Sequence, residues 1–203
     1  MLREPLLGRR PPPRAGTISV KTYPLSFMLS SIALALIIAS AVTPLLYKLR
    51  TEVLTNQLNV QTGPFRQCWS YKDFSECHDI DRDCKVPISS VFPSDWQTTV
   101  FERCSQFNAA RILMLFQILL VGLASFCQFL AICHAFEWCS VPFAMITNSF
   151  ATIIGIIVMC LFIHLKQTED TILINNSDFS VSFILLCISW PLSAISTFLF
   201  AIK

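Results

Sequence analysis

The sequence predicts an all-α membrane protein, a four-transmembrane-helix bundle with a small disulfide-pinned extracellular β-sheet in its first loop. Three observations predict this fold. Hydrophobic residues make up 54% of the 203 residues and charged residues only 14%, too few to cover the surface of a soluble domain. Four uncharged stretches reach the roughly 20 apolar residues that a helix needs to cross a bilayer. Four of the nine cysteines lie in the one long loop.

The predicted membrane helices cover about 25–47, 112–133, 141–165 and 179–202, within one membrane domain over 25–203. Each stretch is expected to be helical because lipid offers no partner for free backbone groups. Residues 1–24 form a basic, proline-rich tail. Ala39-Ser40-Ala41 is similar to a signal-peptidase site, so cleavage there is the alternative to a spanning first helix. The apolar run continues past this point, which favours a span.

Charge asymmetry predicts the orientation of the helices. The tail before the first stretch holds Arg3, Arg9, Arg10, Arg14 and Lys21 against the single acid Glu4. The positive-inside rule places such a tail in the cytoplasm, and four spans return the C-terminus to the same side. We therefore expect an integral protein, in the plasma membrane, with both termini cytoplasmic and the loop at about 48–108 outside the cell. Four basic residues at the opposite helix ends weaken this bias without reversing it: Lys48, Arg50, Arg111 and Lys166.

The cysteines of the long loop agree with this orientation. An even set outside the cell predicts two disulfides, and four cysteines allow three connectivities. The four are Cys68, Cys77, Cys84 and Cys104. The alternative, reduced or metal-bound thiols, requires the inverted topology. β-Branched and aromatic residues on both sides of the turn signal Thr62-Gly63-Pro64 predict a small sheet in this loop.

Polar and small residues recur at helical spacing inside the predicted spans. They are Ser31, Ala35 and Ala39 on the first helix, Gln117 and Gln128 on the second, Asn148, Thr152 and Gly155 on the third, and Ser182, Ser189, Ser193 and Ser196 on the fourth. Helices in lipid associate through close packing and polar contacts, so these seams are expected to hold the bundle together. A permeation path is the alternative, which the absence of Asp, Glu, Lys and Arg from the spans disfavours.

Two motifs resemble those of the claudin-like superfamily, which includes claudins, peripheral myelin protein relatives and calcium-channel γ subunits. Gly63-Pro64-Phe65-Arg66-Gln67-Cys68, followed by Cys77, is similar to the claudin loop motif of Gly-Leu-Trp, two residues and a cysteine, then a second cysteine. The run from Asn108 to Met114 is similar to the claudin entry into the second helix. The amastin branch is a rival, because Trp69-Ser70-Tyr71-Lys72 and Cys104 look similar to amastin positions.

The resemblance implies roles for several residues. It implies a disulfide between Cys68 and Cys77 that pins two strands, which leaves Cys84 and Cys104 to pair with each other. It also implies that Arg111 anchors the loop to the head of the second helix. The alternative for Arg111 is an ordinary interfacial residue that extends its charge to water.

Other candidate sites are few. Phe65, Trp69, Tyr71 and Trp96 are candidate contact residues of an exposed sheet. Cys133 and Cys139 flank the short second connection and are candidates for palmitoylation, and Asn175 opens a glycosylation sequon. No catalytic motif and no metal, cofactor, nucleic-acid or small-molecule site is predicted.

Three functional hypotheses follow. The first is a non-enzymatic cell-surface protein that acts by protein–protein contact through its first loop, in adhesion or lateral assembly. The second is an auxiliary subunit of an ion channel or transporter. The third is a small pore or transporter. The expected partners are membrane lipid and either further copies of the chain or a larger membrane protein.

Overall fold

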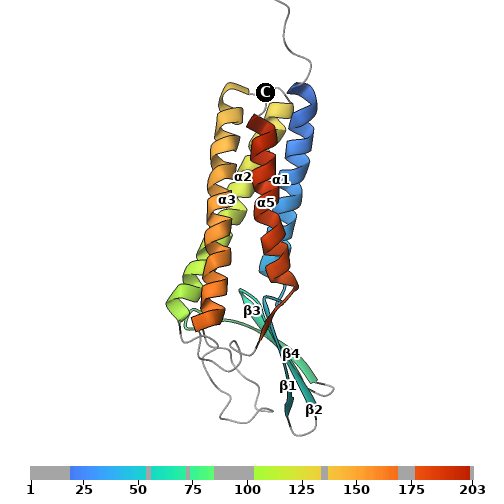
Figure 1. The fold of residues 1–203 in the computed structure, drawn as a ribbon, viewed down its shortest axis with the longest axis vertical. Coiled ribbons are helices and arrows are strands. Elements are labelled where there is room, and N and C mark those ends of the chain that lie inside the picture. Colours follow the sequence, from blue (N-terminus) through green and yellow to red (C-terminus); the bar gives the residue numbers. More distant parts are fainter. Residues whose placement is uncertain are drawn as a thin grey trace, which may run out of the picture.

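The computed structural model describes residues 19–53, 56–71, 74–84, 103–133, 137–168 and 177–201. Four long helices stand side by side, and a β-sheet lies at one end of them (Figure 1). The start of the first helix, the end of the second, the start of the third and the end of the last lie at the opposite end (Figure 1). We call these the sheet end and the terminal end.

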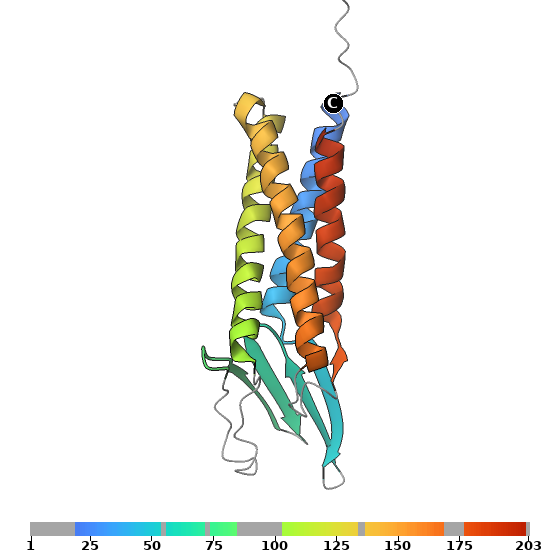
Figure 2. The same ribbon diagram turned by 60° about the vertical axis from the view of Figure 1, so that its left-hand side comes forward.

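The helices are α1 (Ser19–Val42), α2 (Cys104–Ile132), α3 (Glu137–Thr168) and α5 (Val181–Ala201). All four are long and apolar enough to cross a membrane. Both α1 and α3 pack against α2 and α5, so that the four helices form a closed bundle (Figure 2). This is the expected architecture of an integral membrane protein.

The two sides of each helix carry different residues. The interior combines small and polar side chains with large apolar ones such as Phe107, Phe162 and Phe200, whereas the side chains that point outward are mostly large and apolar, as expected where lipid is the solvent. Outward-facing examples are Met28, Ile112, Leu119, Phe126, Phe150, Ile153, Ile184 and Phe198, each more than half exposed. The bundle thus buries its polar groups and presents apolar surface on its flanks.

The sheet has five antiparallel strands in the order β4-β3-β2-β1-β5. Their bounds are β1 (Tyr47–Val53), β2 (Asn56–Thr62), β3 (Arg66–Tyr71), β4 (Phe74–Asp79) and β5 (Asp178–Phe179). The expectation of a sheet built from the first loop alone was incomplete. β5 comes from the segment before α5 and pairs with the start of β1, Tyr47 opposite Phe179 and Lys48 opposite Asp178. The sheet therefore joins two distant parts of the sequence.

The first helix ends at Val42, earlier than the apolar run predicted. Leu46 and Tyr47, read as membrane residues, instead lie in the core between the sheet and the bundle, 0% and 1% exposed. Their backbone needs no helix because the sheet and Ser180, the residue before α5, supply partners. Leu46 N–H donates to the Thr62 carbonyl at 3.0 Å, and its own carbonyl accepts from Ser180 N–H at 3.1 Å. A chain buried in protein satisfies its backbone in this way without helix.

A glycine lets the sheet approach the end of α1. A Cβ added to Gly63 would lie 2.6 Å from the Thr43 carbonyl oxygen and 2.7 Å from Pro44 Cα. Both contacts are with backbone, which has little freedom to give way. Gly63 therefore fits this position because it has no side chain.

Candidate interaction site at the sheet end of the bundle

Both disulfides of the long loop are formed, as expected. Cys68 pairs with Cys77, and Cys84 pairs with Cys104. Cys68 and Cys77 lie directly opposite each other on β3 and β4, with Cα atoms 4.0 Å apart. This bridge fastens the outermost strand to the sheet.

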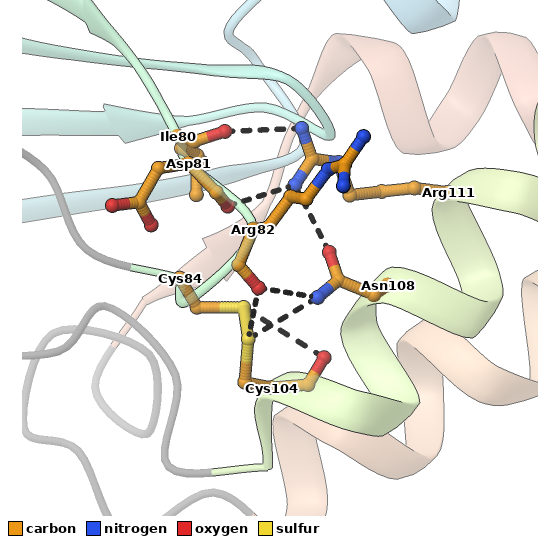
Figure 3. Close-up of a disulfide and its surroundings, with 7 residues drawn as sticks. All are labelled: Ile80, Asp81, Arg82, Cys84, Cys104, Asn108 and Arg111. Carbon is orange, nitrogen blue, oxygen red and sulfur yellow. Dashed lines mark hydrogen bonds between the residues drawn. A yellow bond between two sulfur atoms is a disulfide. The ribbon is translucent and has the colours of Figure 1, made fainter.

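The second disulfide links the sheet to the membrane bundle. Cys84 follows β4 in the sequence, and Cys104 is the first residue of α2. Asn108, one turn further along α2, donates from Nδ2 to the Arg82 carbonyl at 2.7 Å (Figure 3). A covalent and a polar link thus hold the end of the sheet on the head of α2.

Arg111 makes the third link (Figure 3). Its Nη2 donates to the Ile80 carbonyl at 3.1 Å, and its Nη1 donates to the Asp81 carbonyl at 3.2 Å and to Asn108 Oδ1 at 3.1 Å. Its guanidinium carbon lies 4.9 Å from the centre of the Phe65 ring. A planar guanidinium is well suited to several fixed acceptors at once. The sequence resemblance implied an anchor here, and these contacts join α2 to the chain after β4.

The aromatic residues predicted to be contacts lie elsewhere than expected. Trp69 is only 4% exposed and packs with Leu49, Leu58 and Val60 on the inner face of the sheet, with Tyr71 half-buried against this cluster. Phe65 is half-buried beneath Arg111. Trp69 is therefore a core residue, and Phe65 and Tyr71 serve mainly in packing. The fourth candidate, Trp96, lies outside the described residues.

The outer face of the sheet is polar instead. Alternate residues of the strands share this face because side chains alternate along a strand. Its exposed members are Arg50, Gln57, Arg66, Ser75, Cys77 and Asp79. Arg66 Nε lies 3.0 Å from Asp79 Oδ1 in an exposed salt bridge. Beside this face, β4 has no further strand paired to it within the described ranges. An open strand edge is a ready site for pairing with another chain.

A depression lies at the other edge of the sheet, where β5 meets β1. Lys48, Arg50, Asp178, Phe179 and Ser180 line a volume of about 210 Å³. Lys166 Nζ lies 4.6 Å from the centre of the Phe179 ring. Lys48, Arg50 and Lys166 are three of the four basic residues that weaken the charge asymmetry from which the orientation is predicted.

Serine and glutamine side chains join three helices inside the bundle. Ser26 on α1 and Ser196 on α5 exchange hydrogen bonds with each other's backbone, Ser26 Oγ to Ser196 O at 2.8 Å and Ser196 Oγ to Ser26 O at 2.9 Å. Gln128 on α2 donates from Nε2 to Ser196 Oγ at 3.2 Å. The serines expected on the inner face of α5 are all fully buried: Ser182, Ser189, Ser193 and Ser196.

The prediction that Ser31, Ala35 and Ala39 face the interior of the bundle was wrong, because α1 is rotated so that a neighbouring face points inward. Ala35 is exposed, and Ser31 and Ala39 are only half-buried. Instead, a neighbouring face with similar spacing is buried, composed of Ser26, Ser30, Ala33, Ile37 and Ser40. Small residues occur on both faces of this helix, so spacing did not distinguish them.

Two amide side chains define the centre of the bundle. Asn148 donates from Nδ2 to the Ser193 carbonyl at 2.9 Å and to Thr197 Oγ1 at 3.0 Å, which joins α3 to α5. Gln117 packs against Gly155, where an added Cβ would lie 2.5 Å from Gln117 Nε2. Neither amide atom of Gln117 has a hydrogen-bond partner within the described residues. The third helix thus leaves space for a polar side chain from the second.

The remaining candidate residues lie apart from the sheet. Cys133 and Cys139 are both exposed thiols at the terminal end, Cys133 directly after α2 and Cys139 near the start of α3. Asn175 lies outside the described residues. Among the residues that the structure describes, no three His, Cys, Asp or Glu side chains are grouped so that they could hold a metal ion.

Comparison with models of known protein families and with curated protein sequences finds no match for this chain. The class of protein is defined by the fold: four helices able to cross a membrane, with a disulfide-linked β-sheet fastened to one end.

Proposed function

We propose that this chain is a non-enzymatic surface protein that acts by protein–protein contact through the sheet, in adhesion or lateral assembly. In this proposal the sheet end faces outside the cell and both termini are cytoplasmic, at the plasma membrane. The basic tail before α1 supports the orientation. Disulfides, which persist in oxidising compartments, support the same side for the sheet.

The observation that carries the proposal is the attachment of the sheet to the membrane bundle. A disulfide at the first residue of α2, the Arg111 hydrogen bonds to Ile80 and Asp81, and the pairing of β5 with β1 hold it in one orientation. A preorganised surface loses little conformational freedom on binding. The polar outer face and the open edge of β4 are the proposed contact surface, in place of the buried aromatic residues.

Kinship with the claudin-like superfamily is part of the proposal. It is supported by the motifs around Cys68 and Arg111 and by the order of elements, in which a disulfide-bearing sheet follows the first helix. The amastin branch is the rival within it.

An experiment on the outer face tests the contact role. Exchange of the ion pair, Arg66→Asp with Asp79→Arg, keeps an opposite-charge pair while it reverses the pattern presented to a partner. In cells that express two differently tagged copies, we expect the native chain to enrich at cell contacts or to co-purify with its other copy. The exchanged variant should lose this at equal surface expression. Uniform distribution of the native chain, with neither self-association nor a bound partner, contradicts the proposal.

A second role, as an auxiliary subunit of a channel or transporter, is favoured by one observation. A Cβ added to Gly122 on α2 meets nothing within 4 Å. The exposed residues Leu119, Leu123 and Phe126 surround this gap on the flank of the helix. A glycine there permits close approach of another membrane helix. This role predicts that a larger membrane protein co-purifies in mild detergent and that Gly122→Leu, rather than the exchanged ion pair, releases it.

A further inference from the structure

The depression between β5 and β1 lies next to the start of α5, one of the four helices long and apolar enough to cross a membrane. Ser180 lines it, and α5 begins at the next residue. Ser180 N–H is bonded to the Leu46 carbonyl, so this corner is held against the end of the first loop. When α5 spans a bilayer from Val181, the depression lies at the level of the headgroups of the leaflet nearest the sheet.

The charges in the depression suit an anion. Lys48 and Arg50 are two residues apart on β1, so both belong to the outer face. Within the described ranges neither forms a salt bridge, although Lys48 lies opposite Asp178 in the strand register. Lysine and arginine together are a common pair for phosphate, which accepts several charge-assisted hydrogen bonds.

Asp178 narrows the choice of anion. Its exposed carboxylate shares the depression with the two basic residues. A carboxylate opposes a ligand with further negative charge and attracts an ammonium group. The two cations and one carboxylate that line the depression complement a phosphate that carries an ammonium group on the same molecule.

The surroundings favour a lipid over a soluble phosphate. The Phe179 ring lines the depression, stacks on Phe183 at 4.0 Å and lies 5.7 Å from the Tyr47 ring. The Phe179 ring makes one wall of the depression apolar. An exposed apolar stripe begins one residue after Ser180 and continues along α5 through Val181, Ile184 and Ile188. Such a stripe is a surface for an acyl chain.

We propose that this depression binds the headgroup of a zwitterionic phospholipid. Lys48 and Arg50 hold the phosphate, Asp178 holds the ammonium group, and the acyl chains lie along α5. Arg50 belongs both to this site and to the outer face of the sheet, but the Arg66–Asp79 ion pair does not line the depression. Different substitutions therefore test the two proposals, and either can fail without the other.

The test uses the full chain, purified in mild detergent, stripped of lipid and titrated with defined lipids under native mass spectrometry. The lipids are phosphatidylethanolamine, phosphatidylcholine and the anionic phosphatidylglycerol. The double variant Lys48→Gln/Arg50→Gln should bind the two zwitterionic lipids at least about tenfold more weakly, as expected for the loss of charge-assisted hydrogen bonds. The control Arg66→Gln/Arg82→Gln removes two positive charges from exposed residues elsewhere and should bind as the native chain does.

Two further arms separate the alternatives. Asp178→Asn should remove the preference for zwitterionic lipid over phosphatidylglycerol. Inorganic phosphate at millimolar concentration should not displace the lipid, and displacement would overturn the lipid assignment in favour of a soluble phosphate. Equal lipid binding by the two double variants would overturn the site itself. If the first double variant does not fold, Arg50→Gln alone, at an exposed side chain, should still weaken binding about threefold.

Discussion

Arg111 on α2 donates a hydrogen bond from Nη2 to the backbone carbonyl of Ile80, 3.1 Å away, which ties a membrane helix to the end of the sheet. Ile80 itself is 3% exposed and bonds through its N–H to the Phe65 carbonyl. Two successive hydrogen bonds therefore join the head of the helix, the chain after β4 and the residue before β3.

This relationship predicts that charge alone does not replace Arg111. Arg111→Lys keeps the cation but loses the planar group that reaches three acceptors at once. We expect the free energy of unfolding in mild detergent to fall by about 1.5–3 kcal/mol, the usual range for hydrogen bonds to a charged group. Arg66→Lys, at an exposed ion pair, is the control and should change it by less than about 1 kcal/mol. Equal effects of the two substitutions would reduce Arg111 to an ordinary interfacial residue.

The two disulfides should differ in which parts of the structure they hold together. Replacement of Cys84 and Cys104 by serine removes a bridge between residues 20 apart in the sequence. Replacement of Cys68 and Cys77 removes a bridge between residues 9 apart. On the chain-entropy model each loss costs about 3 kcal/mol, so the stabilities should be similar. Only the first change should release the sheet from α2, and limited proteolysis between residues 84 and 104 measures that release. Equal protease resistance of the two variants would argue against the disulfide as the link.

Glycine substitutions test the approach of the sheet to α1. Gly63→Ala introduces a Cβ that clashes with backbone at 2.6 and 2.7 Å, so it should lower the thermal midpoint and impair exit to the cell surface. Gly122→Ala introduces a Cβ into open space and should leave both unchanged, or raise the midpoint because alanine favours helix. A neutral Gly63→Ala would show that the end of α1 and the sheet can separate without cost.

The paired serines predict a modest coupling between α1 and α5. A double-mutant cycle with Ser26→Ala and Ser196→Ala should give about 0.6 kcal/mol, and no more than about 1.7, in the free energy of unfolding. Ser149→Ala, at an exposed position of α3, serves as an uncoupled third site. If the serines instead lined a permeation path, the same variants would change flux in vesicles and leave stability unaltered.

Thiol labelling tests the orientation. Cys133 and Cys139 are exposed at the terminal end. A membrane-impermeant maleimide should therefore label them only after the plasma membrane is permeabilised, with hydroxylamine added first to remove any thioester-linked acyl group. The double variant Cys133→Ser/Cys139→Ser gives the background. Labelling of these thiols in intact cells would invert the topology and remove the sheet from the outside of the cell.

Several features follow from the sequence alone because their cause is local. Lipid forces an uncharged apolar stretch to satisfy its own backbone, so four such stretches determine four helices whatever they pack against. The fully buried serine face of α5 and the disulfides of the long loop were likewise predicted, since helical spacing and cysteine content are properties of the chain itself.

Other features were decided by tertiary structure. Leu46 and Tyr47 have the same apolar side chains in lipid or in a protein core, so the sequence did not reveal that α1 ends at Val42. Trp69 lies inward because strand pairing sets which face a residue joins, and a shift of one residue would reverse it. β5 exists only where residues 178–179 meet the start of β1, and two residues carry no strand signal alone. Local chemistry thus determined the helices, and long-range contacts determined how they meet the sheet.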